Sequence, residues 1–280
     1  LSNFYLNLAK FLNPNFTNFD ILIAENFYIN NKLIHAKKTY EKIKLNGKIY
    51  DWFSSKKIAS ILILQKKNEK AIKSLTKNFE NIEKPTVYEI YDFADFLKNN
   101  KKFKESIKFY SKILENITSE HELYPKATDG RGIAFERINQ WDKAEVDFLN
   151  SLKAEPNQAY VINYLAYTWI EKGIKIKKAL TMLERANNLK KNDGYITDSL
   201  GWALFRLQKY EKAKMHLKEA VKLMPSDPVI NDHYGDSLWM NGDKLQARYY
   251  WNYVLSLEKA EEELKIKIED KLIFGPKLST

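Results

Sequence analysis

A short motif recurs along this chain of 280 residues at nearly constant intervals. Each copy centres on a small residue within a polar, amphipathic segment, at Ala36, Ala71, Ser106, Ala144, Ala179, Ala213 and Ala247. Successive copies are 35, 35, 38, 35, 34 and 34 residues apart. A second small residue precedes each copy by about a dozen residues, at Ala24, Ala59, Ala94, Gly132, Ala166, Gly201 and Gly235. A fixed period in this range indicates a repeat array, in which each repeat packs on its neighbours.

The most regular repeat runs from Gly194 to Asp227 and predicts two short helices, A and B. Its apolar residues recur at helical spacing, and Pro225 ends the second helix. Helix A carries Leu200, Gly201 and Leu204, and the buried stripe of helix B consists of Ala213, Leu217 and Ala220. Only 9 Gly and 7 Pro occur in the chain, too few for a protein built from tight β-turns. The pattern therefore predicts an all-α protein.

This pattern resembles the tetratricopeptide repeat (TPR), which has a small residue at its eighth position, Ala at the twentieth and Pro at the thirty-second. In this register the repeats begin near Thr17, Trp52, Val87, Pro125, Ala159, Gly194 and Pro228. The resemblance implies a right-handed superhelical α-solenoid of TPR helix pairs, in which helix A lines the concave wall. The register divides the chain into helix B of a truncated repeat (1–16), three degenerate repeats (17–124), four regular repeats (125–259), and a capping helix with its tail (260–280).

A second stripe on helix A, at repeat positions two, five, nine and twelve, points away from helix B. In repeats five to seven it is mostly aromatic or short and polar. We predict that it forms a partner-binding groove on the concave wall, made of Asp129, Tyr160, Asn163, Tyr167, Tyr195, Asp198, Trp202, Phe205, Arg206, Asp232, Asp236 and Trp239. Carboxylates and amides can hold the backbone N–H groups of a peptide, and aromatic rings supply apolar contact area at low entropic cost.

A structural interpretation of this stripe stays open. Its aromatic rings would pack between neighbouring A helices, and its Asp and Asn side chains would cap helices or hydrogen-bond between repeats. We expect such a role for Trp141, Trp169 and Trp251, which occupy positions where the family has core aromatics. For Trp202 and Trp239 we expect an exposed binding surface, because large exposed aromatics usually mark interaction sites.

The groove is acidic where chaperone-binding TPR proteins carry a clamp of Lys and Asn for a C-terminal carboxylate. Position five reads Asp129, Asn163, Asp198 and Asp232 in repeats four to seven. Only Arg137 and Arg206 put positive charge nearby. We therefore predict a protein or peptide partner with apolar side chains and some positive charge.

Sequence signals of catalysis or cofactor binding are missing. The chain has no glycine-rich phosphate loop, no His-Glu-x-x-His and no nucleophile elbow. Its four His are scattered and it has no Cys, so we expect no metal site. Asp232 and Asp236 are spaced as an acid/base pair, but no third group accompanies them. We predict a non-catalytic protein with no cofactor and no small-molecule substrate.

The net charge of +10 raises a second function class, a Lys-rich binder of nucleic acid or of an anionic surface. Only five of the 46 basic residues are Arg, the residue favoured for bidentate contacts with bases and phosphates. Solvated helix faces explain the charge better, so nucleic acid is the less favoured partner. No apolar run approaches the roughly 18 residues of a spanning helix, and we expect no transmembrane segment.

Three stretches, NYLAYTW, DGYITDSLGWALF and PVINDHYGDSLW, are similar to envelope-associated repeat proteins of Gram-negative bacteria. These proteins are made with a signal or lipoprotein sequence and act as adaptors, in at least one case for a carboxyl-terminal processing protease. The resemblance implies an envelope protease or assembly factor as partner. Residues 1–14 lack the features of a signal peptide and the first residue is Leu, so we expect the natural start upstream. Whether the protein is periplasmic, outer-membrane-associated or cytoplasmic stays open.

Overall fold

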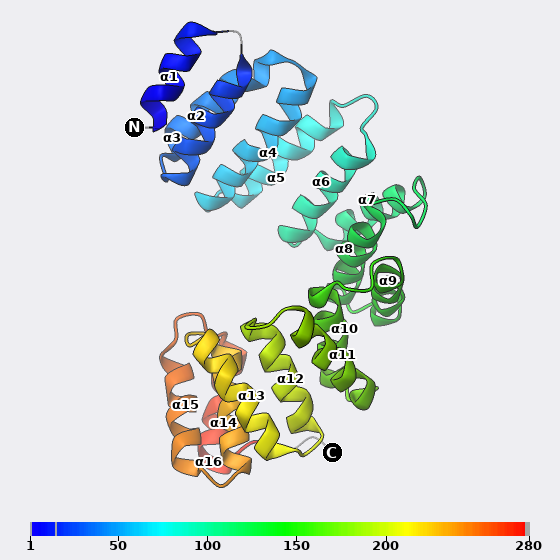
Figure 1. Cartoon of the computed structure of the whole chain (residues 1–280), viewed down its shortest axis with the longest axis vertical. Coiled ribbons are helices and arrows are strands. Elements are labelled where there is room, and N and C mark those ends of the chain that lie inside the picture. The colour runs from blue at the N-terminus through cyan, green and yellow to red at the C-terminus, as the bar shows by residue number, and fades with distance from the viewer. Residues whose placement is uncertain (1, 15, 278–280) are drawn as a thin grey trace. The chain divides into compact units, whose positions relative to one another are not determined.

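The computed structural model describes residues 2–14 and 16–277 (Figure 1). In this part of the chain sixteen α-helices and one short 3₁₀ helix occur, and no β-strand, which confirms the predicted all-α fold. None of these helices is long and apolar enough to cross a membrane. The helices are α1 (Ser2–Leu12), α2 (Thr17–Ile29), α3 (Leu33–Ile43), η1 (Lys44–Asn46), α4 (Lys48–Leu64), α5 (Asn68–Glu80), α6 (Val87–Asn99), α7 (Phe103–Leu114), α8 (Tyr124–Arg137), α9 (Trp141–Ala154), α10 (Ala159–Glu171), α11 (Ile176–Leu189), α12 (Gly194–Arg206), α13 (Tyr210–Leu223), α14 (Pro228–Met240), α15 (Lys244–Ser256) and α16 (Glu262–Phe274).

The chain forms two compact units, residues 1–147 and 148–280, and the division lies inside α9. We call them the first unit and the second unit. Within each unit, helices adjacent in sequence pack against each other, as α6 and α7 do in the first and α12 and α13 in the second. The boundary that the sequence predicts at residue 125 separates degenerate repeats from regular ones. The division after residue 147 instead separates two groups of helices that pack mainly among themselves.

The small residues of the repeat lie where helices A and B touch. Ala24 of α2 and Ala36 of α3 are both fully buried. At Gly201 an added Cβ would lie 2.6 Å from Cγ of Leu217, much closer than two carbon atoms approach. Small residues are therefore required at this contact, because a larger side chain would push the paired helices apart.

The turn from helix A to helix B has one backbone geometry in six repeats. One residue of each turn is left-handed, with φ of 57° to 61° at Asn31, Lys66, Lys101, Asn139 and Gln208, and 88° at Gly242. The next N–H donates to the carbonyl oxygen five positions earlier at 2.8 to 2.9 Å, which satisfies a carbonyl group at the end of helix A. The fifth repeat has the same left-handed residue at Gly173 and the same hydrogen bond, from Ile174 N–H to the Trp169 carbonyl oxygen at 2.9 Å, and adds one residue before helix B, where Lys175 is also left-handed.

Each unit has its own aromatic and aliphatic core. In the first unit Phe79 and Phe93 stack with ring centroids 4.3 Å apart, and Trp52 packs beside them. In the second unit Trp169 and Trp251 are fully buried, as predicted from their positions in the repeat. The remaining predicted core aromatic, Trp141, is half-buried.

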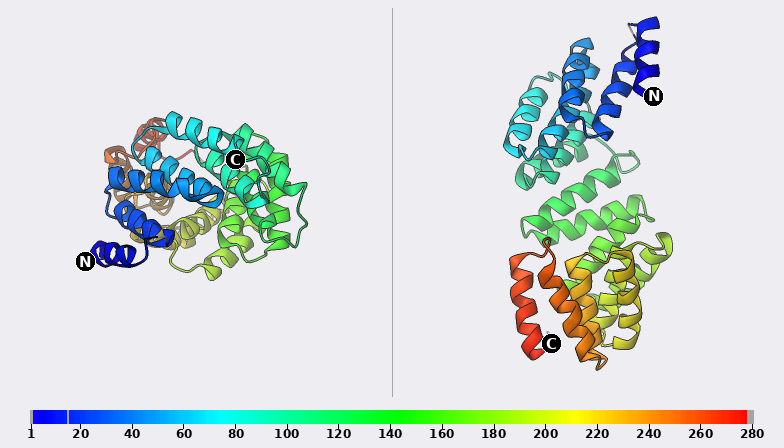
Figure 2. Two further views of the ribbon diagram at one scale, coloured as in Figure 1. Left: turned by 90° about the horizontal axis from the view of Figure 1, so that it is seen from above. Right: turned by 90° about the vertical axis from the view of Figure 1, so that its left-hand side faces the viewer.

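The last helix, α16, lies beside α15 at the C-terminal end of the second unit (Figure 2). Ile268 is its fully buried residue, and Leu264 and Leu272 pack against the same core cluster. These three residues recur at helical spacing within 260–280, where the sequence predicts a capping helix. The helix thus covers apolar surface that the final helix pair would otherwise expose.

Candidate partner-binding surface

The A helices of the second unit, α10, α12 and α14, carry most of the residues predicted to bind a partner. The helix α12 packs against both α10 and α14, and each of the three packs against its own helix B. Asp193 and Asp227 cap α12 and α14, each accepting two backbone N–H bonds at 3.0 to 3.2 Å. These caps fix where the two helices begin, and therefore which side chains face the neighbouring helix.

Two aromatic side chains of the predicted groove are largely exposed. Tyr160 on α10 is 56% exposed and Tyr195 on α12 is 52% exposed, and both occupy position two of their repeats. The hydroxyl group of Tyr160 donates to Asp193 at 3.1 Å, and the ammonium of Lys190 lies 3.8 Å from the centre of its ring. The two rings thus present apolar area at the same place on successive A helices.

Trp202 on α12 is half-buried and contacts both neighbouring A helices. Its Nε1 donates to Glu171 of α10 at 2.7 Å. Its indole ring is nearly parallel to the imidazole of His233 on α14, with centroids 4.0 Å apart, and to the ring of Phe205, 4.7 Å away. Trp202 therefore joins three helices instead of standing free.

Asp198 and His233 form a buried pair between α12 and α14. The imidazole Nδ1 lies 3.0 Å from one carboxylate oxygen of Asp198 and 3.1 Å from the other. Burial acts to lower the pKa of His233, but the carboxylate of Asp198, with Asp232 and Asp236, raises it above its ordinary value. The arrangement favours a charged imidazolium held by Asp198.

Asp232 and Asp236 of α14 hold a lysine that comes from the capping helix. Nζ of Lys271 on α16 donates to both carboxylates at 2.7 and 2.8 Å. Burial, and next the nearby charge of Asp232, raise the pKa of Asp236 to about 7, although Lys271 opposes this. Burial acts to lower the pKa of Lys271, but the two carboxylates raise it. Lys271 therefore fixes α16 to the acidic end of α14.

Tyr167 and Asn163 of α10 are half-buried. Burial, and then the carboxylates of Glu171 and Asp198, hold the pKa of the Tyr167 hydroxyl well above its ordinary value, so that it remains a hydrogen-bond donor. Oδ1 of Asn163 is buried and accepts no hydrogen bond within the described chain. Buried amide oxygens are normally paired, so this atom is an available acceptor.

Trp239 and Phe205 are covered by their surroundings. Trp239 is half-buried against Trp251, with the cationic groups of Lys244 and Arg248 5.1 and 4.9 Å from the centre of its ring. A Cβ added at Gly275 would lie 2.5 Å from its Cε2, so the chain after α16 also presses on this indole. Phe205 is buried.

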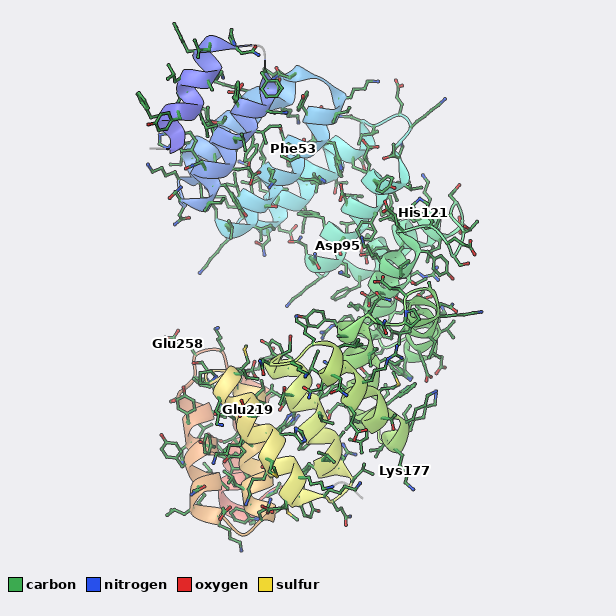
Figure 3. All side chains as sticks on the ribbon, viewed as in Figure 1. Phe53, Asp95, His121, Lys177, Glu219 and Glu258 are labelled. Atoms are coloured by element: carbon green, nitrogen blue, oxygen red, sulfur yellow. The ribbon has the colours of Figure 1, made fainter. Side chains whose placement is uncertain are left out.

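Arg206 is half-buried at the end of α12, where Trp202 and Tyr210 also line a small surface pocket. Asp129, by contrast, lies on α8 in the first unit. Burial raises the pKa of Asp129 to about 6, while Lys98 opposes this and Asp95, on α6, adds to it (Figure 3). The structure therefore brings Asp129 together with other acids of its own unit.

These placements correct one expectation from the sequence. Asp198, Asp232, Asp236 and Phe205 were expected on an open concave wall, but all four are buried. The indoles of Trp202 and Trp239 are half-buried rather than uncovered. The physical reason is that, at this repeat spacing, the second stripe of one A helix faces the next A helix. The interpretation in which the stripe hydrogen-bonds between repeats therefore applies to the acidic residues, while binding by the remaining positions stays a prediction.

Acidic and basic side chains segregate between the two kinds of helix in the second unit. The A helices α10, α12 and α14 carry Glu171, Asp198, Asp232 and Asp236, with Arg206 and His233. The B helices α11, α13 and α15 carry Lys177, Lys178, Arg185, Lys212, Lys214, Lys218, Lys222, Lys244 and Arg248, with Glu184, Glu211 and Glu219. Lys177 points away from the helices of this unit (Figure 3). Three of the four A-helix carboxylates are buried and paired with His233 or Lys271, which leaves Glu171 as the exposed one.

Three residues at this surface were not singled out from the sequence: Glu171, His233 and Lys271. Each lies about one repeat from its partner, since His233 is 35 residues from Asp198 and Lys271 is 39 and 35 from Asp232 and Asp236. Opposite charges separated by one period would have pointed to His233 and Lys271, whereas Glu171 accepts a hydrogen bond from the uncharged indole of Trp202, 31 residues away. Among the described residues, no three His, Cys, Asp or Glu side chains converge as metal ligands.

Comparison with known proteins supports the tetratricopeptide repeat resemblance. Residues 199–227 match the tetratricopeptide repeat family. A TPR repeat-containing protein of Pseudomonas aeruginosa is 28% identical over 106 residues, which cover 38% of this chain. The matched segment spans only 18% of the length of that relative.

Solved structures show the same fold. A tetratricopeptide repeat protein from Parabacteroides merdae matches with a TM-score of 0.69 at 14% identity, over 90% of this chain and 97% of that one. YrrB, described as a TPR protein with an unusual peptide-binding site, matches with a TM-score of 0.52 at 18% identity, over 70% and 97%. PilF of Pseudomonas aeruginosa matches with a TM-score of 0.54 at 17% identity, over 66% and 85%. The fold is therefore an α-solenoid of TPR helix pairs, an architecture typical of non-catalytic protein-interaction scaffolds.

Proposed function

We propose that the second unit is a non-catalytic scaffold that captures a partner protein segment along the A helices α10, α12 and α14. The observation that carries this proposal is the pair of exposed rings at Tyr160 and Tyr195, which repeats one apolar contact on successive helices. Tyrosines of this kind are common among the residues that dominate binding energy, because they offer large contact area at low entropic cost.

The exposed carboxylate of Glu171 on α10 supports a partner segment that carries basic residues among apolar ones. Glu171 is exposed beside Trp202, where an incoming Lys or Arg would find a carboxylate. Asp198 and Asp236 are already engaged by His233 and Lys271, and in this proposal they set the helix spacing without touching the partner. The buried pairs make the surface rigid, so little entropy would be lost when a partner orders on it.

A peptide-binding experiment tests this proposal with defined probes. Three sets of short peptides are compared by fluorescence polarisation: apolar with basic residues, apolar with acidic residues, and uncharged polar. We expect the first set to bind best, and the double variant Tyr160→Ala/Tyr195→Ala to weaken its binding by about 2 kcal/mol, roughly thirtyfold.

The matched control is Leu245→Ala/Tyr249→Ala, which removes two exposed apolar side chains from helix α15 of the same unit. This variant should bind as the parent protein does. Preference for acidic peptides, or equal losses in the two double variants, would show that the A-helix side is not the binding surface.

We also infer that the partner belongs to a bacterial cell-envelope complex, with an envelope protease or assembly factor as the class of partner. The similarity of repeats five to seven to envelope-associated adaptors supports this. Cell fractionation of the protein expressed from its complete gene gives the test. Recovery of the protein in the cytosolic fraction, together with its resistance to protease added to spheroplasts, would contradict the envelope assignment.

A further inference from the structure

The outward face of α1 is apolar. Phe4 is 66% exposed, Leu8 47% and Phe11 81%, and their spacing of four and three residues places them on one side of the helix. Leu6 and Ala9 are half-buried, and α1 packs against α2. Helix α1 lies at the N-terminal end of the first unit (Figure 2). Exposed apolar clusters of this kind usually mark an interaction site.

The next three B helices of the first unit carry lysines at the equivalent places of the repeat. Counted forward from Phe4 and Leu8 in steps of 34 or 35 residues, these places are Lys38 and Lys42 on α3, Lys73 and Lys77 on α5, and Lys108 and Lys112 on α7. All six are exposed. We call them the lysine ladder. Because the repeats stack in register, the ladder and the apolar strip of α1 share the outward face of the first unit.

The lysine ladder is not neutralised by this protein. None of its six ammonium groups forms an ion pair with a carboxylate in the described chain. Other lysines of the same unit are paired, such as Lys57 with Glu25 at 2.7 Å and Lys98 with Asp95 at 2.6 Å. Six like charges on one face repel one another, and an external anionic surface would remove that repulsion.

We propose that the outward face of the first unit docks on an anionic lipid surface. The lysine ladder contacts the headgroups, and Phe4, Leu8 and Phe11 enter the boundary between headgroups and acyl chains. The two contributions complement each other, since stable attachment to a bilayer usually needs an apolar insertion together with a polybasic patch. Helices α1, α3, α5 and α7 contain no Arg, and Leu8 offers nothing to a phosphodiester backbone, so this face suits lipid better than nucleic acid.

Vesicle binding by the full chain tests the proposal. Sedimentation is measured with vesicles of phosphatidylcholine alone and with vesicles containing phosphatidylglycerol. Each Lys near an anionic bilayer strengthens binding about fivefold, so Lys73→Gln/Lys108→Gln should weaken binding to anionic vesicles about 30-fold. The matched control Lys212→Gln/Lys218→Gln changes the net charge equally on an exposed face of the second unit and should bind as the parent does.

A second pair of variants separates insertion from electrostatics. Phe4→Ser and Phe11→Ser replace exposed side chains, so the fold is retained, and each should weaken binding at least about tenfold at any salt concentration. Failure to bind anionic vesicles at low salt, or equal binding to neutral ones, would overturn the proposal. So would binding of single-stranded RNA more tightly than vesicles with the same loss in Lys73→Gln/Lys108→Gln, which would identify nucleic acid as the occupant.

Discussion

In both units an ion pair between the same two repeat positions joins neighbouring A helices. The acidic and basic residues change places between the two pairs, and the pairs differ in burial. In the first unit Lys56 on α4 pairs with Asp92 on α6. In the second unit Asp198 on α12 pairs with His233 on α14. In both cases position five of one repeat contacts position six of the next. The stacking geometry thus determines which two repeat positions meet. The sequence determines which of the two carries the acidic residue and which the basic one.

Burial determines how much each contact contributes to stability. The side chains of Lys56 and Asp92 are 35% and 34% exposed, whereas those of His233 and Asp198 are 8% and 7% exposed. Exposed ion pairs contribute about 0–1 kcal/mol, because water already solvates both charges. Removing one partner of a buried pair typically costs about 3–5 kcal/mol, because the other charge stays buried without a counter-charge. Equivalent positions should therefore respond very differently to mutation.

The largest expected effect is at the buried pair. Asp198→Ala leaves the imidazole of His233 without its acceptor and should lower the free energy of opening of α12 and α14 by about 4 kcal/mol. Hydrogen exchange of the amides in α12 and α14 measures this, with the amides of α4 and α6 as an internal reference. A loss below about 1 kcal/mol would mean that burial does not distinguish the two units.

The next largest effect is at the capping helix. Lys271→Met preserves the length and apolar stem of the side chain but leaves Asp232 and Asp236 without their cation, and should destabilise the docking of α16 by about 3 kcal/mol. Exchange of the α16 amides reports the change. Lys267→Met is the control, because Lys267 pairs with an exposed carboxylate, that of Glu263, and its loss should cost less than about 0.5 kcal/mol.

A pH titration should also separate the buried contacts of α12 and α14 from the exposed pair of α4 and α6. The folded pKa of Asp236 is raised to about 7 and that of His233 is raised as well, so the folded state binds protons more tightly than the unfolded chain. The free energy of opening of α12 and α14 should therefore fall as the pH rises from 5 to 8, by about 2 kcal/mol. Asp236→Asn should flatten this slope. A slope of the opposite sign would show that Lys271 stabilises ionised Asp236 more than burial destabilises it.

The smallest expected effect is at the exposed pair. Lys56→Ala should lower the free energy of opening of α4 and α6 by less than about 1 kcal/mol, because both side chains remain largely solvated. Added salt should diminish the effect further. The same hydrogen-exchange experiment measures it, and a loss comparable to that of Asp198→Ala would remove the distinction between the units.

The sequence predicts the helix pairs of this fold because their determinants are local. Small residues such as Ala24 and Gly201 recur at the repeat period and mark where helices A and B touch. The turn of the fifth repeat follows from counting residues. The direction in which the second stripe faces depends instead on how successive repeats stack. The partner of Asp198 lies in the next repeat and that of Asp232 in the capping helix, so no pattern within one repeat revealed that these carboxylates are buried.

The candidate surface was therefore predictable only in part. Tyr160 and Tyr195 lie at the outer edge of their helices and are exposed, as the repeat position indicated. Trp202 lies farther along α12, where the neighbouring A helices reach it, and Phe205 packs against Trp202 and Tyr210. When helices stack, a side chain at one edge of a helix stays exposed to solvent. A side chain near the contact with a neighbouring helix becomes buried. The same position-by-position reasoning identifies His233 and Lys271 once the stacking is known.

The recurring turn between helices A and B has a consequence for how such a chain can change its length. Six turns share one left-handed residue and one hydrogen bond, so each junction accepts the same pair of helices. Excising a whole repeat, or duplicating it, would restore the same junction and leave the neighbouring pairs intact. Loss of a few residues within a helix would instead rotate every side chain after it. The chain can therefore gain or lose whole helix pairs as modules, with the special contacts of α16 confined to its last one.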